Sequence, residues 1–172
     1  MENNHTIATE LATAFTELEK SVQRFNPTQF NTKPADKSWS AAMVVQHLIL
    51  AGKGIDQVLL GNTKPTVGAA DQKVETIRNI LLDFKAKYNS PPFIEPKDQH
   101  YEQEEQLQQL QQIVDAILPI LPNLDLSETC LEFEFPGLGQ VTRLELISFL
   151  IFHTQRHTHQ LHHMFNAVAT SV

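Results

Sequence analysis

Cysteine is nearly absent from this sequence of 172 residues, in which Cys130 stands alone. A single cysteine excludes an intrachain disulfide framework and cannot by itself build a thiolate metal site. We expect Cys130 to be a structural residue, and the scarcity of cysteine fits a reducing compartment. Residues 1–5 contain neither a basic start nor an apolar stretch of signal-peptide length, so we predict a cytoplasmic protein.

Long hydrophobic runs are also missing. The most apolar run, residues 146–152, is seven residues long and includes Ser148, whereas a membrane-spanning helix requires ~20 apolar residues. The sequence therefore predicts no membrane span and no membrane partner.

Basic residues are scarce in the second part of the chain. The sequence has a formal net charge of −7, and residues 98–172 hold only Arg143 and Arg156 against 10 acidic residues. A surface that binds nucleic-acid phosphates needs clustered positive charge, which this distribution does not provide. We therefore expect no nucleic acid among the partners.

Apolar residues recur at intervals of three and four along most of the chain, which is typical of helices that bury one face. The expected helices cover residues 7–25, 38–58, 74–88 and 107–121, and a final helix begins at a capping box formed by Thr142 and Glu145. Within residues 129–135 apolar and acidic side chains alternate as in a strand, but no partner strand is visible. We predict one all-α domain over residues 1–172, an antiparallel four-helix bundle with one additional helix or extended connector.

Five of the eight histidines lie between positions 153 and 163, in the final predicted helix. At 100° per residue, His157 is about 40° from His153 on the helix circumference, so both side chains lie on one face. The same face carries the apolar stripe of this helix, which predicts that the pair points inward. The stripe comprises Leu146, Leu150, Met164 and Val168.

The other three histidines of this helix lie away from the apolar stripe. His159 and His163 are about 80–120° from His153, and His162 is on the opposite side. We expect them to face solvent or an interface. In a metal-carrying protein they would provide additional coordination at the surface.

His47 occupies the apolar stripe of the second predicted helix, among Met43, Val44, Ala51 and Ile55. A polar ring on such a face needs a partner. Three inward histidines from two helices can bind a divalent transition metal, for which zinc or nickel is suited, and they leave a coordination position for water. The alternative is that each histidine is a core residue that forms a hydrogen bond with a neighbouring group.

Two motifs of the sequence carry a resemblance to a known family. The first combines Lys-Ser-Trp-Ser at residues 37–40 with Gln46-His47-Leu48, and the second is the run of residues 153–161. Both resemble motifs of the DinB-like superfamily of metal-binding helical bundles. The first is similar to the family's Trp-Ser opening of the second helix and its His-Leu pair. The second is similar to the family's H-x-x-x-H-x-G-Q-hydrophobic pattern. A turn at residues 136–139 and the order of elements also agree. His159 stands where the family often has glycine, so it either crowds a neighbouring helix or offers another ligand.

The resemblance implies that His47, His153 and His157 are three metal ligands. It also implies a metal-dependent thiol transferase or isomerase that uses a low-molecular-weight thiol, or a hydrolase, in either case with an unidentified small-molecule substrate. A metal ion lowers the pKa of a bound thiol or water, which suits both chemistries. The family further suggests a homodimer. The competing hypothesis is a non-catalytic small-molecule-binding or stress-associated interaction protein.

Four other residues have more limited expected roles. Glu10 and Glu17 of the first helix are candidates for a general base, because each has a carboxylate. Both flank the apolar stripe of that helix, so we expect them to be solvated. Gln160 is expected to pack rather than to support a metal ligand. Trp39 is expected to pack beneath the start of the second helix rather than to line the mouth of a pocket.

Overall fold

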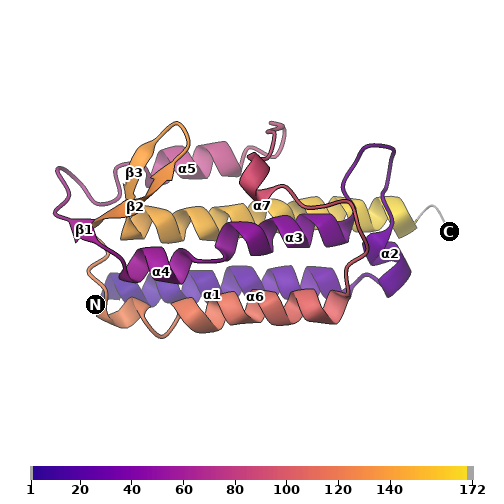
Figure 1. The fold of residues 1–172 in the computed structure, drawn as a ribbon, viewed down its shortest axis with the longest axis horizontal. Helices are drawn as coiled ribbons and strands as arrows, with labels where there is room; N and C mark the ends of the chain where they lie inside the picture. The colour runs from indigo at the N-terminus through magenta and orange to yellow at the C-terminus, as the bar shows by residue number, and fades with distance from the viewer. Residues whose placement is uncertain (1, 170–172) are drawn as a thin grey trace.

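The protein is mostly helical, and its long helices lie side by side (Figure 1). The computed structural model describes residues 2–169. The elements in chain order are α1 (Glu2–Gln23), α2 (Pro27–Asn31), α3 (Ala41–Gly52), α4 (Ile55–Leu60), β1 (Thr63–Lys64), α5 (Val74–Leu81), the 3-10 helix η1 (Pro92–Ile94), α6 (Gln103–Ile117), the 3-10 helix η2 (Leu121–Asn123), β2 (Thr129–Phe135), β3 (Gly139–Thr142) and α7 (Arg143–Ala169). The predominance of helix agrees with the sequence prediction.

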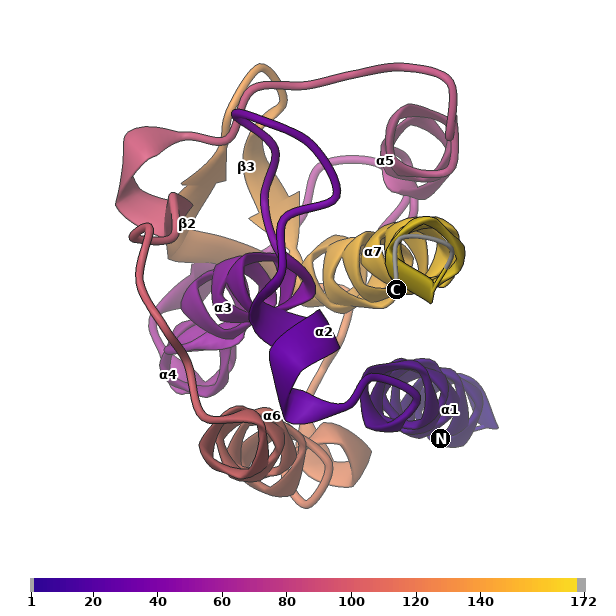
Figure 2. The same cartoon turned by 90° about the vertical axis from the view of Figure 1, so that its right-hand side faces the viewer.

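The helices α1, α3, α6 and α7 surround a common core and are seen nearly end-on in Figure 2. α1 packs against α6 and α7, and α3 packs against the same two helices. α1 and α7 run in one direction and α3 and α6 in the other, so α3 and α7 are antiparallel whereas α1 and α7 are parallel (Figure 1). Helices that run in the same direction need a long connection between them. Residues 61–102 make this connection between α4 and α6, with α5 packed on α7 and η1 packed on α3.

Apolar side chains from these helices form the core, as their helical spacing predicts. Fully buried examples are Leu11 and Leu18 of α1, Phe30 of α2, Ile117 of α6 and Leu146 of α7. Each such side chain contributes roughly 1.5–3 kcal/mol by leaving water. Packing, more than helix propensity, therefore holds the helices in place.

α3 begins after the capping residue Ser40 and ends shortly before Gly54. Ser40 Oγ accepts a hydrogen bond from the Met43 N–H at 3.2 Å, which satisfies one of the free amides at the helix N-terminus. Gly54 has a φ of +87°, a conformation that residues with side chains rarely adopt. The helix expected over residues 38–58 is therefore two helices, α3 and α4.

α5 is shorter than predicted. The helix expected over residues 74–88 ends at Leu81, and Phe84 and Tyr88 of its expected apolar stripe are exposed. The physical reason is Arg156 of α7, whose guanidinium donates to the carbonyl oxygen of Leu81 and to two later carbonyls at 2.6–3.0 Å. The carbonyl of Leu81, the last residue of the helix, therefore has a donor without a further helical turn.

The expected extended connector is the central strand of a three-stranded antiparallel sheet. β2 pairs with β3 on one side and with β1 on the other, so the all-α assignment is wrong in this part of the chain. At the turn into β3, Gly137 and Gly139 have φ values of 81° and 68°. β1 has only two residues, too few for a recognisable alternating pattern. β1 was therefore not visible in the sequence, and β3, with four residues between the expected turn and the capping box, is also short.

α7 begins directly after β3, at the predicted capping box. The Thr142 N–H donates to Glu145 Oε2 at 2.9 Å, and the Glu145 N–H donates to Thr142 Oγ1 at 3.1 Å. The second carboxylate oxygen of Glu145 accepts the Lys73 N–H at 2.7 Å. The capping box is thus confirmed, and it also ties the residue before α5 to the start of α7.

One segment, Ala41–Leu60, is long and apolar enough to cross a membrane by length and composition. It contains α3 and α4, and half of it is buried inside the protein. Core helices of soluble proteins pass the same test, so this segment is weak support for a membrane span.

Candidate metal centre

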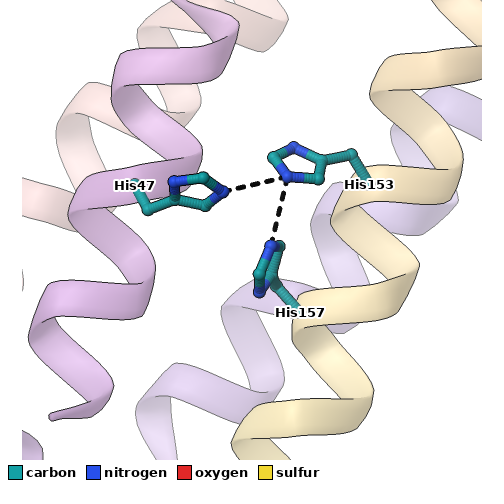
Figure 3. Close-up of side chains that lie close together, drawn as sticks. All are labelled: His47, His153 and His157. Atoms are coloured by element: carbon teal, nitrogen blue, oxygen red, sulfur yellow. Dashed lines mark hydrogen bonds between the residues drawn. The ribbon is translucent and has the colours of Figure 1, made fainter. Parts of the chain in front are cut away.

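Three histidines singled out in the sequence meet between α3 and α7 (Figure 3). His47 lies on α3, and His153 and His157 lie one turn apart on α7. They are 4%, 6% and 8% exposed, respectively. The inward orientation expected from their positions in the two apolar stripes is therefore confirmed.

The three rings converge through their Nε2 atoms. His153 Nε2 is 3.0 Å from His47 Nε2 and 3.1 Å from His157 Nε2. Ligand atoms from the three side chains all lie within 4.8 Å of one another. Two nitrogens bound tetrahedrally to zinc are about 3.3 Å apart, so the two distances from His153 Nε2 are close to those of a metal site.

Two of these histidines turn their other ring nitrogen toward an acceptor. His47 Nδ1 is 2.9 Å from the carbonyl oxygen of Ile94 in η1, and His157 Nδ1 is 2.8 Å from Gln160 Oε1. These oxygens can only accept, so each neutral ring carries its proton on Nδ1 and directs the Nε2 lone pair into the cluster. Histidines that bind metal are usually oriented in this way.

His153 is oriented by aromatic packing instead. Its Nδ1 is buried and has no hydrogen-bond partner among the described residues. The ring stacks on Phe149, with centroids 5.1 Å apart and 18° between the planes, and Phe149 in turn contacts Phe135 of β2. The sheet therefore helps to position the third ring of the cluster.

Burial keeps the three imidazoles neutral near pH 7. Desolvation lowers the pKa of His47, and the hydrogen bond to Ile94 partly offsets this effect. Desolvation, followed by the proximity of His157, His47 and Arg156, lowers the pKa of His153 well below its ordinary value of 6.5. The pKa of His157 is lowered to about 3, mainly by desolvation and then by His47. Neutral imidazole is the form that binds a metal ion.

The convergent nitrogens have too few protons for each to form its own hydrogen bond. With the protons of His47 and His157 on Nδ1, both of their Nε2 atoms are acceptors, and His153 has at most one Nε2 proton to donate. That proton would be shared between acceptors at 3.0 and 3.1 Å. A divalent cation at the point of convergence would interact favourably with all three lone pairs, so the donor set fits a metal ion.

Gln160 and Trp39 contact the cluster more directly than the sequence indicated. Gln160, which was expected only to pack, is the acceptor for His157 Nδ1. Trp39 lies beside the His47 ring, with ring centroids 5.2 Å apart, as well as next to the N-cap residue of α3. Both side chains therefore help to fix the orientation of a cluster histidine.

The remaining histidines of α7 lie outside the cluster. His159 stacks on Phe84, His163 is close to His159, and His162 contacts Ser21 of α1. The pKa of His159 is lowered, mainly by desolvation and then by the neighbouring His163 and His162. His162 and His163 are exposed, as their helical phase predicts.

No carboxylate joins the three histidines among the residues that the structure describes. Glu10 and Glu17 are exposed on α1, and Glu17 pairs with Lys20 at 2.8 Å, in agreement with the expectation that both are solvated. Cys130 is buried in β2, and desolvation raises the pKa of its thiol. The side chains in contact with the three rings are aromatic or neutral polar groups, and Arg156 is a charged group near them.

Three residues around the cluster were not singled out in the sequence: Ser90, Ile94 and Phe149. Ser90 Oγ is 3.3 Å from His47 Nδ1, and the Ile94 carbonyl is closer still. Both belong to the long connection, whose path no local pattern reveals. Phe149 precedes His153 by one helical turn, and this i,i+4 spacing is a signal from which its stacking could have been predicted.

The comparisons with known proteins identify one family. A family model described as the DinB superfamily matches residues 10–161, a range that contains the three clustered histidines and Gln160. Searches of curated proteins and of solved structures found no significant match.

Proposed function

Because the chain belongs to the DinB superfamily, we propose that it is a metal-dependent enzyme whose divalent ion is bound by His47, His153 and His157. The observation that carries the proposal is the convergence of three Nε2 atoms, two of them from rings whose Nδ1 atoms have hydrogen-bond partners outside the cluster. Zinc and nickel are the ions we favour, since both bind neutral imidazole well. A free, buried cysteine is compatible with a cytoplasmic location.

Three protein nitrogens leave at least one coordination position for substrate or water. A divalent ion bound there lowers the pKa of a coordinated thiol or water and supplies a nucleophile near neutral pH. We therefore propose either transfer or isomerisation of a low-molecular-weight thiol conjugate, or hydrolysis. The contribution of the chain is to hold the Nδ1 protons of His47 and His157 away from the cluster, and to exclude bulk water by burying the three rings.

The first test is elemental analysis of protein purified without an affinity tag or added metal. We expect the His47→Ala variant to contain about one zinc or nickel ion per chain fewer than the parent, because only the pair on α7 remains at the buried centre. Circular dichroism of both samples controls for folding. If neither sample contains metal, and the parent binds no more added zinc or nickel per chain than His47→Ala does, the three histidines are hydrogen-bonded core residues and the proposal is wrong.

Replacement of Gln160 by Leu is expected to lower the affinity for the ion by roughly 10–100-fold, because it removes the acceptor that orients His157. Competition against a chromophoric chelator measures the change. Gln155→Leu is the matched control, since Gln155 is exposed on the same helix. Equal affinities for the two variants would contradict the role that we assign to Gln160.

A further inference from the structure

The three histidines of α7 outside the cluster differ in their partners. His163 Nε2 is 3.2 Å from His159 Nε2, and the two residues are one helical turn apart. His162 Nε2 is instead 2.6 Å from Ser21 Oγ of α1. Of these three side chains, only His159 and His163 therefore bring ring nitrogens together.

The geometry of this pair suits a shared cation. Two adjacent nitrogens bound at about 2.0–2.1 Å are about 2.9 Å apart around a square-planar ion and about 3.3 Å apart around a tetrahedral one. The observed 3.2 Å between His159 Nε2 and His163 Nε2 lies within this range. Both rings have access to solvent, so neither nitrogen requires the other as a hydrogen-bond partner.

Phe84 fixes one ring of the pair in advance. It stacks on His159 with centroids 3.9 Å apart and 11° between the planes. Less side-chain entropy is then lost when His159 binds an ion. The exposed ring of His163 is left to adjust its position.

The electrostatic surroundings allow a cation at this position. The nearby Arg156 is directed toward three carbonyl oxygens, those of Leu81, Asp83 and Ala86, at 2.6–3.0 Å. The chain as a whole has a net charge of −7. Within the described residues, no third histidine, cysteine or carboxylate completes the pair into a larger ligand group.

We propose that His159 and His163 form a second, exposed site for a late first-row divalent ion, with solvent in the remaining coordination positions. The chemical class is Cu²⁺, Ni²⁺ or Zn²⁺, and Cu²⁺ binds most tightly of the three. The site shares no ligand with the buried cluster. It therefore binds its ion whether or not the buried cluster does.

The test is titration of the full chain with nickel chloride, followed by calorimetry. The His163→Ala variant is expected to bind one nickel ion fewer per chain than the parent, whereas His162→Ala, which removes the adjacent exposed histidine, binds as many as the parent. Circular dichroism verifies that both variants retain their helices. The proposal is overturned if His163→Ala binds as many ions as the parent, or if His162→Ala loses the ion instead.

The outcome is independent of the proposed function. A protein in which the buried cluster binds no metal still loses a nickel ion in His163→Ala. Conversely, loss of metal in His47→Ala with no change in His163→Ala supports the buried centre and overturns the exposed site.

Discussion

Replacement of His157 by Ala is expected to abolish binding of the ion at the buried centre, a loss of about one ion per chain, while the helix content remains near that of the parent. Its Nε2 is one of three convergent donors, and it lies 3.1 Å from His153 Nε2. Loss of a direct ligand should lower the affinity for the ion by more than the roughly 10–100-fold that is typical when a residue that only orients a ligand is lost. Alanine has the highest helix propensity, so α7 itself should persist.

Metal analysis and far-ultraviolet circular dichroism check this expectation together. His162→Ala is the matched control, because His162 is exposed on the same helix and contacts Ser21 rather than the cluster. Metal content unchanged in His157→Ala would remove the ligand assignment. Loss of the buried ion in His162→Ala would show instead that the assigned face of α7 is wrong.

The metal-free protein is expected to lose stability steeply as the pH falls below about 6.5. The pKa of His157 is about 3 in the folded state, against an ordinary value of 6.5, so between these values the unfolded chain binds more protons. Neutral His157 contributes its full stabilisation when the pH is above the pKa of this residue in the unfolded chain. That stabilisation is lost as the pH falls toward the pKa of His157 in the folded protein. At pH 5 the loss from this residue is about 2 kcal/mol.

Urea denaturation in the presence of a chelator, at pH 7 and at pH 5, measures this loss. Carboxylates also contribute to acid unfolding, so the quantity to compare is the difference between the parent and His157→Gln, which keeps a polar group but binds no proton. We expect the parent to lose about 2 kcal/mol more than the variant. His5→Gln, at an exposed position of α1, is the control and should behave as the parent. If the free energy of unfolding has the same pH dependence in the parent and in His157→Gln, His157 is not buried as a neutral ring.

The inward position of the three histidines could be predicted because it depends on local geometry. His153 and His157 are separated by one helical turn, and the apolar residues around them on α7 define the buried face. His47 is surrounded by an apolar stripe in the same way on α3. Helical periodicity and a capping box therefore predict which face of each helix is buried. They do not predict which residues pack against that face.

The surroundings of the cluster could not be predicted because they depend on distant partners. The acceptor of His47 Nδ1 is a backbone carbonyl, that of Ile94, and any residue type could supply it. α5 ends at Leu81 because of Arg156, a residue 75 positions later. β2 gains its second partner from a two-residue strand, β1, that carries no pattern of its own.

The separation of the cluster histidines along the chain determines how metal binding and folding are coupled. His153 and His157 belong to one helix, whereas His47 is 106 residues from His153. A pair one turn apart can capture an ion in any state in which that helix forms, and binding to an unfolded state reduces the stabilisation of the native one. The bond to His47 requires closure of the long loop between α3 and α7. In the proposed centre, the ion therefore stabilises the native fold through His47, whereas an ion held by His159 and His163 stabilises only a turn of α7.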